Sequence, residues 1–277
     1  MESGDTIKKE AFIGVGNMGG ALARAAGRAV GADQVVLINR TPSKAEALAA
    51  ELGCVAAADP MEAVQSARYI FLGVKPNGMC PLLAELAPVL AYCRKVKVLV
   101  SMAAGLRIED MRPYLKAAGY NVPVVRIMPN TCVAIGKGMT AISIDERVDE
   151  CWIPGVEELL SATGRVVRIS ESLMDQFSAV AGCGPAFVYP YIEALADGAV
   201  STGLPRQQAM EYAAQMVLGA AAMVLESGKH PGQLKDEVCS PGGSTIAGVA
   251  ELERGGLRAA AINAVQAAYE KSTKLGK

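Results

Sequence analysis

A chain of 277 residues is long enough for two compact domains, each with its own core. Apolar residues make up 51% of it and charged residues 20%, which is a globular and not a disordered composition. The 27 basic residues nearly balance the 28 acidic ones and form no block, so we expect no nucleic-acid partner. The mean hydropathy of +0.26 is high for a soluble protein, as expected if apolar surface is buried between subunits.

The cysteines and the single histidine limit the available chemistry. The seven cysteines are scattered and form no CxxC pair, which is typical of a reducing compartment. Because His230 is the only histidine, in a predicted loop, a histidine-based metal site is excluded. The acidic start of the chain is unlike a secretion signal, and the longest apolar helical stretch, residues 216–225, is far shorter than the roughly 20 residues that cross a membrane. We expect a cytoplasmic protein with no metal and no membrane association.

Up to residue 168, short β-branched runs alternate with alanine-rich helical segments. The runs cover residues 11–15, 35–38, 69–74, 96–101, 124–128, 139–144 and 166–169. This alternation is typical of a mostly parallel sheet with helices on both faces. We therefore expect residues 1–168 to form an α/β domain.

From residue 170 onward the pattern is helical, with no convincing strand. Ser or Pro at starts and Gly at ends predict helices over residues 170–181, 185–203, 205–228, 243–254 and 256–274. Alanine and methionine are dense in these segments, and little polar sequence remains to cover them. The sequence predicts an all-α second domain, residues 169–277, that buries itself against a second copy of the chain.

The first predicted strand leads into Gly14-Val15-Gly16-Asn17-Met18-Gly19, a G-x-G-x-x-G motif that opens a helix. Gly14 permits a tight turn, Gly16 lets the backbone approach a pyrophosphate, and Gly19 lets the helix pack on the strand. The helix N-terminus offers unpaired N–H groups to the phosphates. A plain glycine turn is the alternative, but the strand–helix context favours a Rossmann-type dinucleotide site. We place Gly14, Gly16, Asn17, Met18 and Gly19 in it.

The end of the second strand bears on which dinucleotide binds. NAD-selective sites usually carry an acid there, whereas this chain reads Asn39-Arg40-Thr41-Pro42. Arg40 can form a planar fork to a 2′-phosphate, with Thr41, Ser43 or Lys44 as further donors. Alternatively, Thr41 caps a helix that Pro42 opens and Arg40 is solvated, and both can hold at once. We expect NADPH, with NADH as the alternative, and assign Asn39, Arg40 and Thr41 to the cofactor site.

The segment 236–248, Asp-Glu-Val-Cys-Ser-Pro-Gly-Gly-Ser-Thr-Ile-Ala-Gly, closely resembles the signature of the pyrroline-5-carboxylate reductases. The resemblance covers essentially the whole chain, because further motifs follow in the family's order: residues 14–19, 74–76, 101–105, 128–131, 182–185, 196–198, 203–205 and 230–236. It implies a Rossmann-type domain followed by an all-α dimerisation domain. The implied reaction is NAD(P)H-dependent reduction of the cyclic imine 1-pyrroline-5-carboxylate to L-proline, the last step of proline biosynthesis.

The substrate carries a carboxylate and an imine, so its site needs an anion cradle and a hydrogen-bonding group near nitrogen. Small residues in segment 240–245 expose backbone N–H groups at a helix start, where an anion is favoured. By resemblance, the hydroxyl of Thr245 binds the imine nitrogen and relays a proton, which makes it the catalytic residue. Ser240, Gly243 and Ser244 would line the carboxylate pocket. The plain structural alternative is a helix start with Ser240 as N-cap and Pro241 at the first position.

The resemblance also assigns residues around the nicotinamide half of the cofactor. Val74, Lys75 and Pro76 would contact the cofactor after a strand end, although Lys75 could equally be a solvated lysine. Ala103 and Ala104 would lie beside the nicotinamide ring, where small side chains leave room.

Glu171 matches a family acid near substrate and cofactor, and we place it among the substrate-binding residues, although it also suits a first helical turn. Asn130 and Thr131, after another strand, could simply form a turn. The chain departs from common relatives at Cys183 (often Ser), Cys132 (often Pro) and 59–60 (Asp-Pro where an Asn often contacts the adenosine).

Two other functions remain open. A related NADP-dependent imine or hydroxy-acid reductase would share the glycine motif and a helical second domain, but no second-domain lysine lies in a matching motif. A non-catalytic NADP-binding protein would not need the intact Ser-Pro-Gly-Gly-Ser-Thr segment. The resemblance implies a homodimer, and it leaves larger rings and the ring size of the substrate open.

Overall fold

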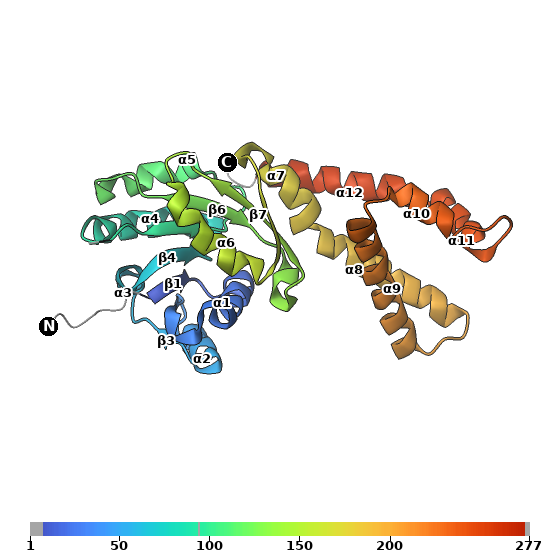
Figure 1. Cartoon of the computed structure of the whole chain (residues 1–277), viewed down its shortest axis with the longest axis horizontal. Coiled ribbons are helices and arrows are strands. Elements are labelled where there is room, and N and C mark those ends of the chain that lie inside the picture. The colour runs from blue at the N-terminus through green and yellow to red at the C-terminus, as the bar shows by residue number, and fades with distance from the viewer. Residues whose placement is uncertain (1–7, 94, 275–277) are drawn as a thin grey trace. The chain divides into compact units, whose positions relative to one another are not determined.

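The computed structural model describes residues 8–93 and 95–274 (Figure 1). The first residues, on which the expectation about secretion rested, lie outside this range. The chain divides into two compact units, Met1–Cys183 with Ala268–Lys277, and Gly184–Ala267. This division falls later than the expected boundary after residue 168, because short helical turns follow the last strand before the second unit begins.

The first unit is built on one eight-stranded sheet in the order β3-β2-β1-β4-β5-β6-β7-β8. Its strands are β1 Lys8–Ile13, β2 Val35–Ile38, β3 Val55–Ala56, β4 Ala67–Leu72, β5 Val98–Ser101, β6 Val124–Met128, β7 Gly138–Ile144 and β8 Gly164–Arg168. Every neighbouring pair is parallel except β6 and β7. The order reverses between β1 and β4, which is the switch point where Rossmann-type sheets bind ligands. The expected α/β fold is confirmed, and only the two-residue β3 had no matching run.

Helices cover both faces of the sheet (Figure 1). One face packs on α1 Asn17–Val30, α2 Pro42–Leu52 and α6 Ile153–Ser161 through a core that includes Phe12 and Phe71, stacked with ring centroids 4.7 Å apart. The other face packs on α3 Pro60–Ser66, α4 Pro76–Ala91, α5 Ile108–Met111 and the 3₁₀ helix η2 Arg112–Ala118. Burial on both faces explains why the central strands read as continuous apolar runs.

The first unit also contains several short helical elements. They are η1 Ala32–Gln34, η3 Thr131–Ile135, η4 Glu150–Trp152, η5 Glu171–Leu173, α7 Met174–Phe177 and the π-helix η6 Ser178–Gly182. The single helix expected over residues 170–181 is therefore wrong. Ser170 does not cap it, because its hydroxyl pairs with that of Ser172 at 2.8 Å.

The second unit consists of helices. These are α8 Gly184–Ser201, α9 Arg206–Ser227, α10 Pro231–Glu237, α11 Ser244–Arg254 and most of α12 Leu257–Ser272. Gly203 and Gly228 have positive φ angles just past α8 and α9, as their positions predicted. Helix α10 was not predicted from the sequence. His230 is its N-cap, and its Nδ1 accepts a hydrogen bond from the N–H of Gly232 at 3.1 Å.

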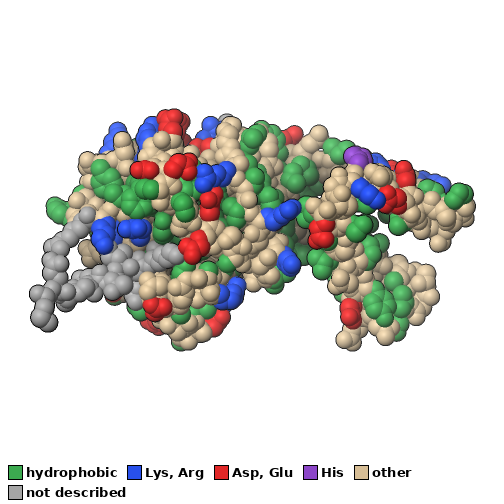
Figure 2. Space-filling model, viewed as in Figure 1, with side chains coloured by type: hydrophobic (Ala, Val, Ile, Leu, Met, Phe, Trp, Pro, Cys, Tyr) green, Lys and Arg blue, Asp and Glu red, His purple; other side chains and the backbone are tan. Residues whose placement is uncertain are grey.

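The second unit buries few of its own apolar side chains. Its core cluster contains Ala196, Ala209 and Ala213, where α8 and α9 pack together. Large apolar side chains on α9 stay exposed, among them Tyr212, Leu218 and Leu225 at 55%, 54% and 60%. Figure 2 shows hydrophobic side chains gathered over this helix. No helix in the described part of the chain is both long and apolar enough to span a membrane.

Candidate active site

Three glycines bring the ends of β1 and β4 against the start of α1. Gly14 has φ +97°, and its N–H donates to the carbonyl of Ile38 at 2.8 Å. A Cβ on Gly19 would lie 2.0 Å from the carbonyl oxygen of Gly14, and one on Gly73 would lie 2.3 Å from the same oxygen. Only glycine fits at these positions. Gly73, one residue past the end of β4, was not predicted.

In the same turn, Gly16 has no neighbouring atoms on the side where a Cβ would lie. Gly16 is the N-cap of α1, makes no side-chain cap bond and would have no atom within 4 Å of an added Cβ. It lines a cavity of about 850 Å³ together with Gly14, Val74 and Lys75. The N-terminal N–H groups of α1 are thus available to an anion such as a pyrophosphate.

The rim of this cavity at the end of β2 suits a 2′-phosphate. Arg40, Thr41 and Lys44 all line it and are exposed. Thr41 is the N-cap of α2 and Pro42 opens the helix, but the Thr41 hydroxyl makes no cap bond. Two cationic side chains and a free hydroxyl therefore lie on one rim, with no acidic residue between Ile38 and Lys44. This donor set fits the phosphate of NADP, and the acid that usually selects a ribose hydroxyl is missing from this segment.

Asn39 links the glycine turn to this rim. Its Oδ1 accepts a hydrogen bond from the N–H of Val15 at 3.2 Å, and its Nδ2 donates to the carbonyl of Thr41 at 3.1 Å. The side chain lines the cavity while both ends of its amide hold backbone. Asn39 thus connects the glycine turn to the part of the rim that carries Arg40 and Thr41.

The other assigned cofactor residues differ in exposure. Lys75 is the N-cap of α4 and Pro76 its first residue, so this turn is a helix start with an exposed lysine. Asn17 is exposed at the start of α1, whereas Met18 packs against the core. Ala103 is 2% exposed, and Ala104 lies half-buried beside a small cluster around Met128. Of these six residues, only Lys75 lines the cavity.

The Asp-Pro pair at 59–60 also lines the cavity. Asp59 is the N-cap of α3, and its carboxylate accepts a hydrogen bond from the N–H of Glu62 at 2.8 Å. Asp59 therefore has a structural role at the start of α3.

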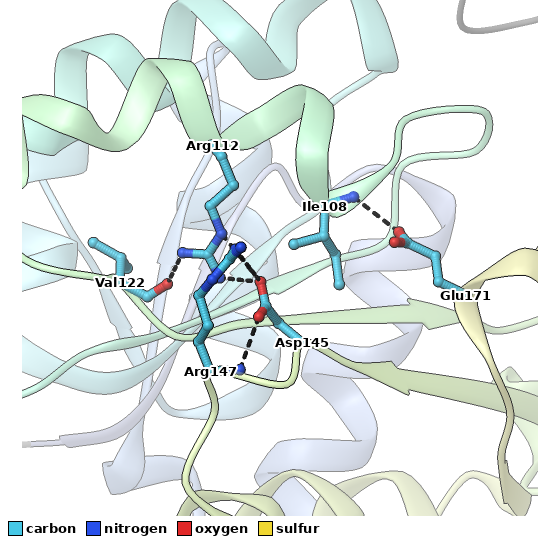
Figure 3. A network of polar contacts seen from close by, with 6 residues as sticks. All are labelled: Ile108, Arg112, Val122, Asp145, Arg147 and Glu171. Carbon is cyan, nitrogen blue, oxygen red and sulfur yellow. Dashed lines mark hydrogen bonds and ion pairs between the residues drawn. The ribbon is translucent and has the colours of Figure 1, made fainter.

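Glu171 has two hydrogen-bond donors within the first unit. Its Oε1 accepts from the N–H of Ile108 at 2.8 Å, at the start of α5, and from Nη1 of Arg126 at 3.2 Å. Figure 3 shows the carboxylate reaching Ile108 from a separate segment. Arg126 is 2% exposed, and its Nε has no partner among the described residues. Glu171 therefore balances a buried guanidinium and caps the helix that follows Ala103 and Ala104.

The same α5–η2 segment is held at a second point. Arg112 donates through Nε to Asp145 at 3.0 Å and through Nη1 to the carbonyl of Val122 at 2.6 Å (Figure 3). Asp145 also accepts from the N–H of Arg147 at 2.9 Å. Two acids from separate strand ends thus anchor the segment after the Ala103–Ala104 turn.

The loop 240–245 lies in the second unit and ends in a helix start. Helix α11 begins at Ser244 with Gly243 as its N-cap, so the alternative with Ser240 as N-cap and Pro241 at the first position is wrong. Gly242 has φ +67°, and a Cβ on Gly243 would lie 2.4 Å from Oγ of Ser240. No side chain caps α11. Its first N–H groups, including that of Thr245, are therefore available to a carboxylate.

Comparisons with known proteins cover both units. A family profile described as pyrroline-5-carboxylate reductase dimerisation matches residues 171–275, and one described as NADP oxidoreductase coenzyme F420-dependent matches residues 9–105. The pyrroline-5-carboxylate reductase of Escherichia coli (strain K12) is 40% identical over 98% of this chain and 99% of its own length. That of Pisum sativum is 38% identical over 95% and 94%. The chain belongs to the pyrroline-5-carboxylate reductase family.

A solved relative agrees in fold and in cofactor. The Plasmodium falciparum pyrroline carboxylate reductase with NADP bound superposes with a TM-score of 0.86 at 30% identity, covering 99% of both chains. The donors on the cavity rim of this chain fit the 2′-phosphate of the NADP that this relative binds.

Replacing Gly19 by Ala tests the glycine contact. The new methyl group would overlap the Gly14 carbonyl, so we expect the free energy of unfolding to fall by about 1–3 kcal/mol and NADPH binding to weaken. Gly27→Ala on the same helix is the control, because its Cβ would meet no atom and alanine favours the helix by about 0.5–1 kcal/mol. Chemical denaturation measures both, and equal stabilities would contradict the contact.

Replacing Arg40 by Asp tests cofactor discrimination. The change removes a charged donor and adds a repelling carboxylate, so the Michaelis constant for NADPH should rise about 10- to 100-fold, and that for NADH far less. Steady-state kinetics with both cofactors measures this. Arg28→Asp, an exposed site at the far end of α1, controls for the change in net charge. Equal effects on the two cofactors would remove Arg40 from 2′-phosphate recognition.

Proposed function

We propose that the chain reduces 1-pyrroline-5-carboxylate to L-proline with NADPH, in the last step of proline biosynthesis. The observation that carries this function is the near full-length similarity to pyrroline-5-carboxylate reductases, which includes both the nucleotide unit and the helical unit. The NADP-type cavity supports it independently, because it arises from named side chains of this chain.

Reduction of the imine adds a hydride to its carbon and a proton to its nitrogen. When bound, the nicotinamide of NADPH supplies the hydride. In our proposal the glycine turn and the start of α1 hold the pyrophosphate, while Arg40 and Thr41 hold the 2′-phosphate. The turn 74–76 and the small side chains of Ala103 and Ala104 would border the nicotinamide half.

The loop 240–245 is the proposed substrate site. Ser240, Gly243 and Ser244 would surround the carboxylate, which the uncapped N-terminus of α11 favours. Thr245, the second residue of α11, would hydrogen-bond the imine nitrogen and relay the proton. Hydride transfer requires this loop to meet a nicotinamide, held either by the same chain or by a partner copy.

Glu171 would position the cofactor site and not carry out a chemical step. Its bonds to Ile108 and Arg126 support a positioning role for the turn 102–107. Only one of its two carboxylate oxygens is engaged by these donors, so a second contact with substrate is compatible with them.

We further propose a homodimer in the cytoplasm. A nucleotide domain of residues 1–168 and a substrate and dimerisation domain of residues 169–277 would match the start of the dimerisation profile at residue 171. The exposed apolar residues of α9 support burial against a second copy. Formation of larger rings is not part of the proposal.

Thr245→Ala tests the proton relay together with the reaction. Purified protein is mixed with NADPH and pyrroline-5-carboxylate, and loss of NADPH absorbance is followed. Because positioned proton transfer contributes about 100-fold or more, turnover should fall at least that far in the variant. Thr245→Ser keeps a hydroxyl and should retain most of the rate. Near-normal turnover of Thr245→Ala would exclude the relay, and absence of any activity in the unaltered chain would exclude the reaction.

Leu218→Asp tests the proposed interface. A charge placed on the exposed apolar face of α9 should shift the protein from dimer to monomer, as sedimentation velocity would show. Gln65→Asp, on the exposed surface of α3 in the first unit, adds the same charge away from α9. An unchanged mass for Leu218→Asp would contradict an interface built on this helix.

A further inference from the structure

The π-helix η6 and the helix α8 follow one another where the first unit ends, and we call residues 178–185 the helical joint. The N–H of Cys183 donates to the carbonyl of Ser178 at 2.9 Å, which closes a π-type turn at the end of η6. In a regular α-helix the carbonyl of Ala181 would accept a bond from the N–H of residue 185. That residue is Pro185, which has no N–H. The joint therefore leaves the Ala181 carbonyl without its helical donor.

Asn130, from a different part of the chain, supplies the missing donor. Its Nδ2 donates to the carbonyl of Ala181 at 2.9 Å, and the side chain is buried, with 8% of the residue exposed. Its Oδ1 accepts from the N–H groups of Cys132 at 3.2 Å and Met139 at 3.4 Å. Since these two partners are donors and Ala181 is an acceptor, only one orientation of the amide satisfies all three.

The hydrogen bond between Asn130 and Ala181 joins two segments that are distant in the sequence. Asn130 lies two positions after the end of β6 and is the N-cap of η3, and its side chain is held by one N–H group of η3 and one of β7. Ala181 precedes Gly184, the first residue of α8 and of the second unit, by only three positions. Asn130 thus connects the segment just before the second unit, which carries the loop 240–245, to η3 and β7.

We propose that Asn130 is a positioning residue for hydride transfer, and this inference rests on the proposed function. It acts through the Ala181 carbonyl and fixes the course of the chain into α8. The Ala181 carbonyl needs the hydrogen bond from Asn130 because Pro185 has no N–H group to donate to it. Neither residue needs to touch cofactor or substrate. Hydride transfer depends steeply on placement, so a looser joint should slow the chemical step more than it weakens binding.

The first test separates turnover from cofactor binding. In Asn130→Ala, we expect kcat to fall about 10- to 100-fold, the range that a misplacement of about 1 Å produces. The dissociation constant for NADPH, measured by fluorescence titration, should stay within about twofold because the cavity residues are unchanged. Loss of NADPH affinity in parallel with kcat would place Asn130 at the cofactor and overturn the inference. An unchanged kcat would overturn it as well.

The second test restores the donor from the other side. Pro185→Ala returns an N–H at the position from which a helix would bond the Ala181 carbonyl. Alone, it should change kcat little, since Asn130 still holds the carbonyl. In the double variant Asn130→Ala/Pro185→Ala, we expect most of the lost kcat to return. Independent effects that simply multiply would overturn the inference, because distant or unrelated changes add in free energy.

Asn130→Asp covers the case in which Asn130→Ala does not fold. The aspartate has the same shape and can still accept from Cys132 and Met139, but at neutral pH it cannot donate to Ala181. We expect a folded protein with normal NADPH affinity and reduced kcat. A folded Asn130→Asp with full kcat would overturn the inference. The unaltered chain is assayed in parallel, so its failure to reduce pyrroline-5-carboxylate would count against the proposed function and not against Asn130.

Discussion

The close approach of three backbones at Gly14, Gly19 and Gly73 is the constraint on which the nucleotide unit depends. A methyl group at position 19 or 73 would reach within 2.0 or 2.3 Å of the Gly14 carbonyl, so the ends of β1 and β4 and the start of α1 meet only as bare backbone. This meeting brings the N-terminus of α1 to the cavity and leaves Gly16 open beside it. Three glycines make the unfolded chain more flexible, and the apolar strands buried on both faces of the sheet offset that entropy.

Asn39 and Asn130 each lie after a strand of this sheet, and the side-chain amide of each connects two separate backbone segments. Each amide accepts from backbone N–H groups and donates to a backbone carbonyl: Asn39 joins Val15 to Thr41, and Asn130 joins the η3 turn to Ala181. Glu171 acts similarly at α5, where one carboxylate serves both Ile108 and Arg126. Loops at the ligand-binding edge of a parallel sheet have few partners in regular structure, so single polar side chains set their geometry.

Local patterns could predict most of the fold but only part of the site. Central strands were readable because double burial gives continuous apolar runs, and the glycine turn was readable because its geometry depends on a few adjacent residues. The two-residue β3 is too short for any pattern, and the break of the helix expected over 170–181 depends on the π-turn at Ser178. Gly73 and the Arg126 partner of Glu171 were missed for a different reason. Their neighbours in space lie far away in sequence, and no local signal marks them.

The second unit links folding to self-association. Its own buried cluster centres on three alanines, and alanine side chains remove little apolar area from water. Larger side chains such as Leu218 and Leu225 stay exposed on α9. Burial against a second copy, as the dimerisation profile indicates, would supply the apolar contact that these helices do not make among themselves. The loop 240–245 is carried by this same unit, and its geometry depends on Gly242, Gly243 and the start of α11. The chemistry proposed for Thr245 would therefore depend on the stability of the α11 start.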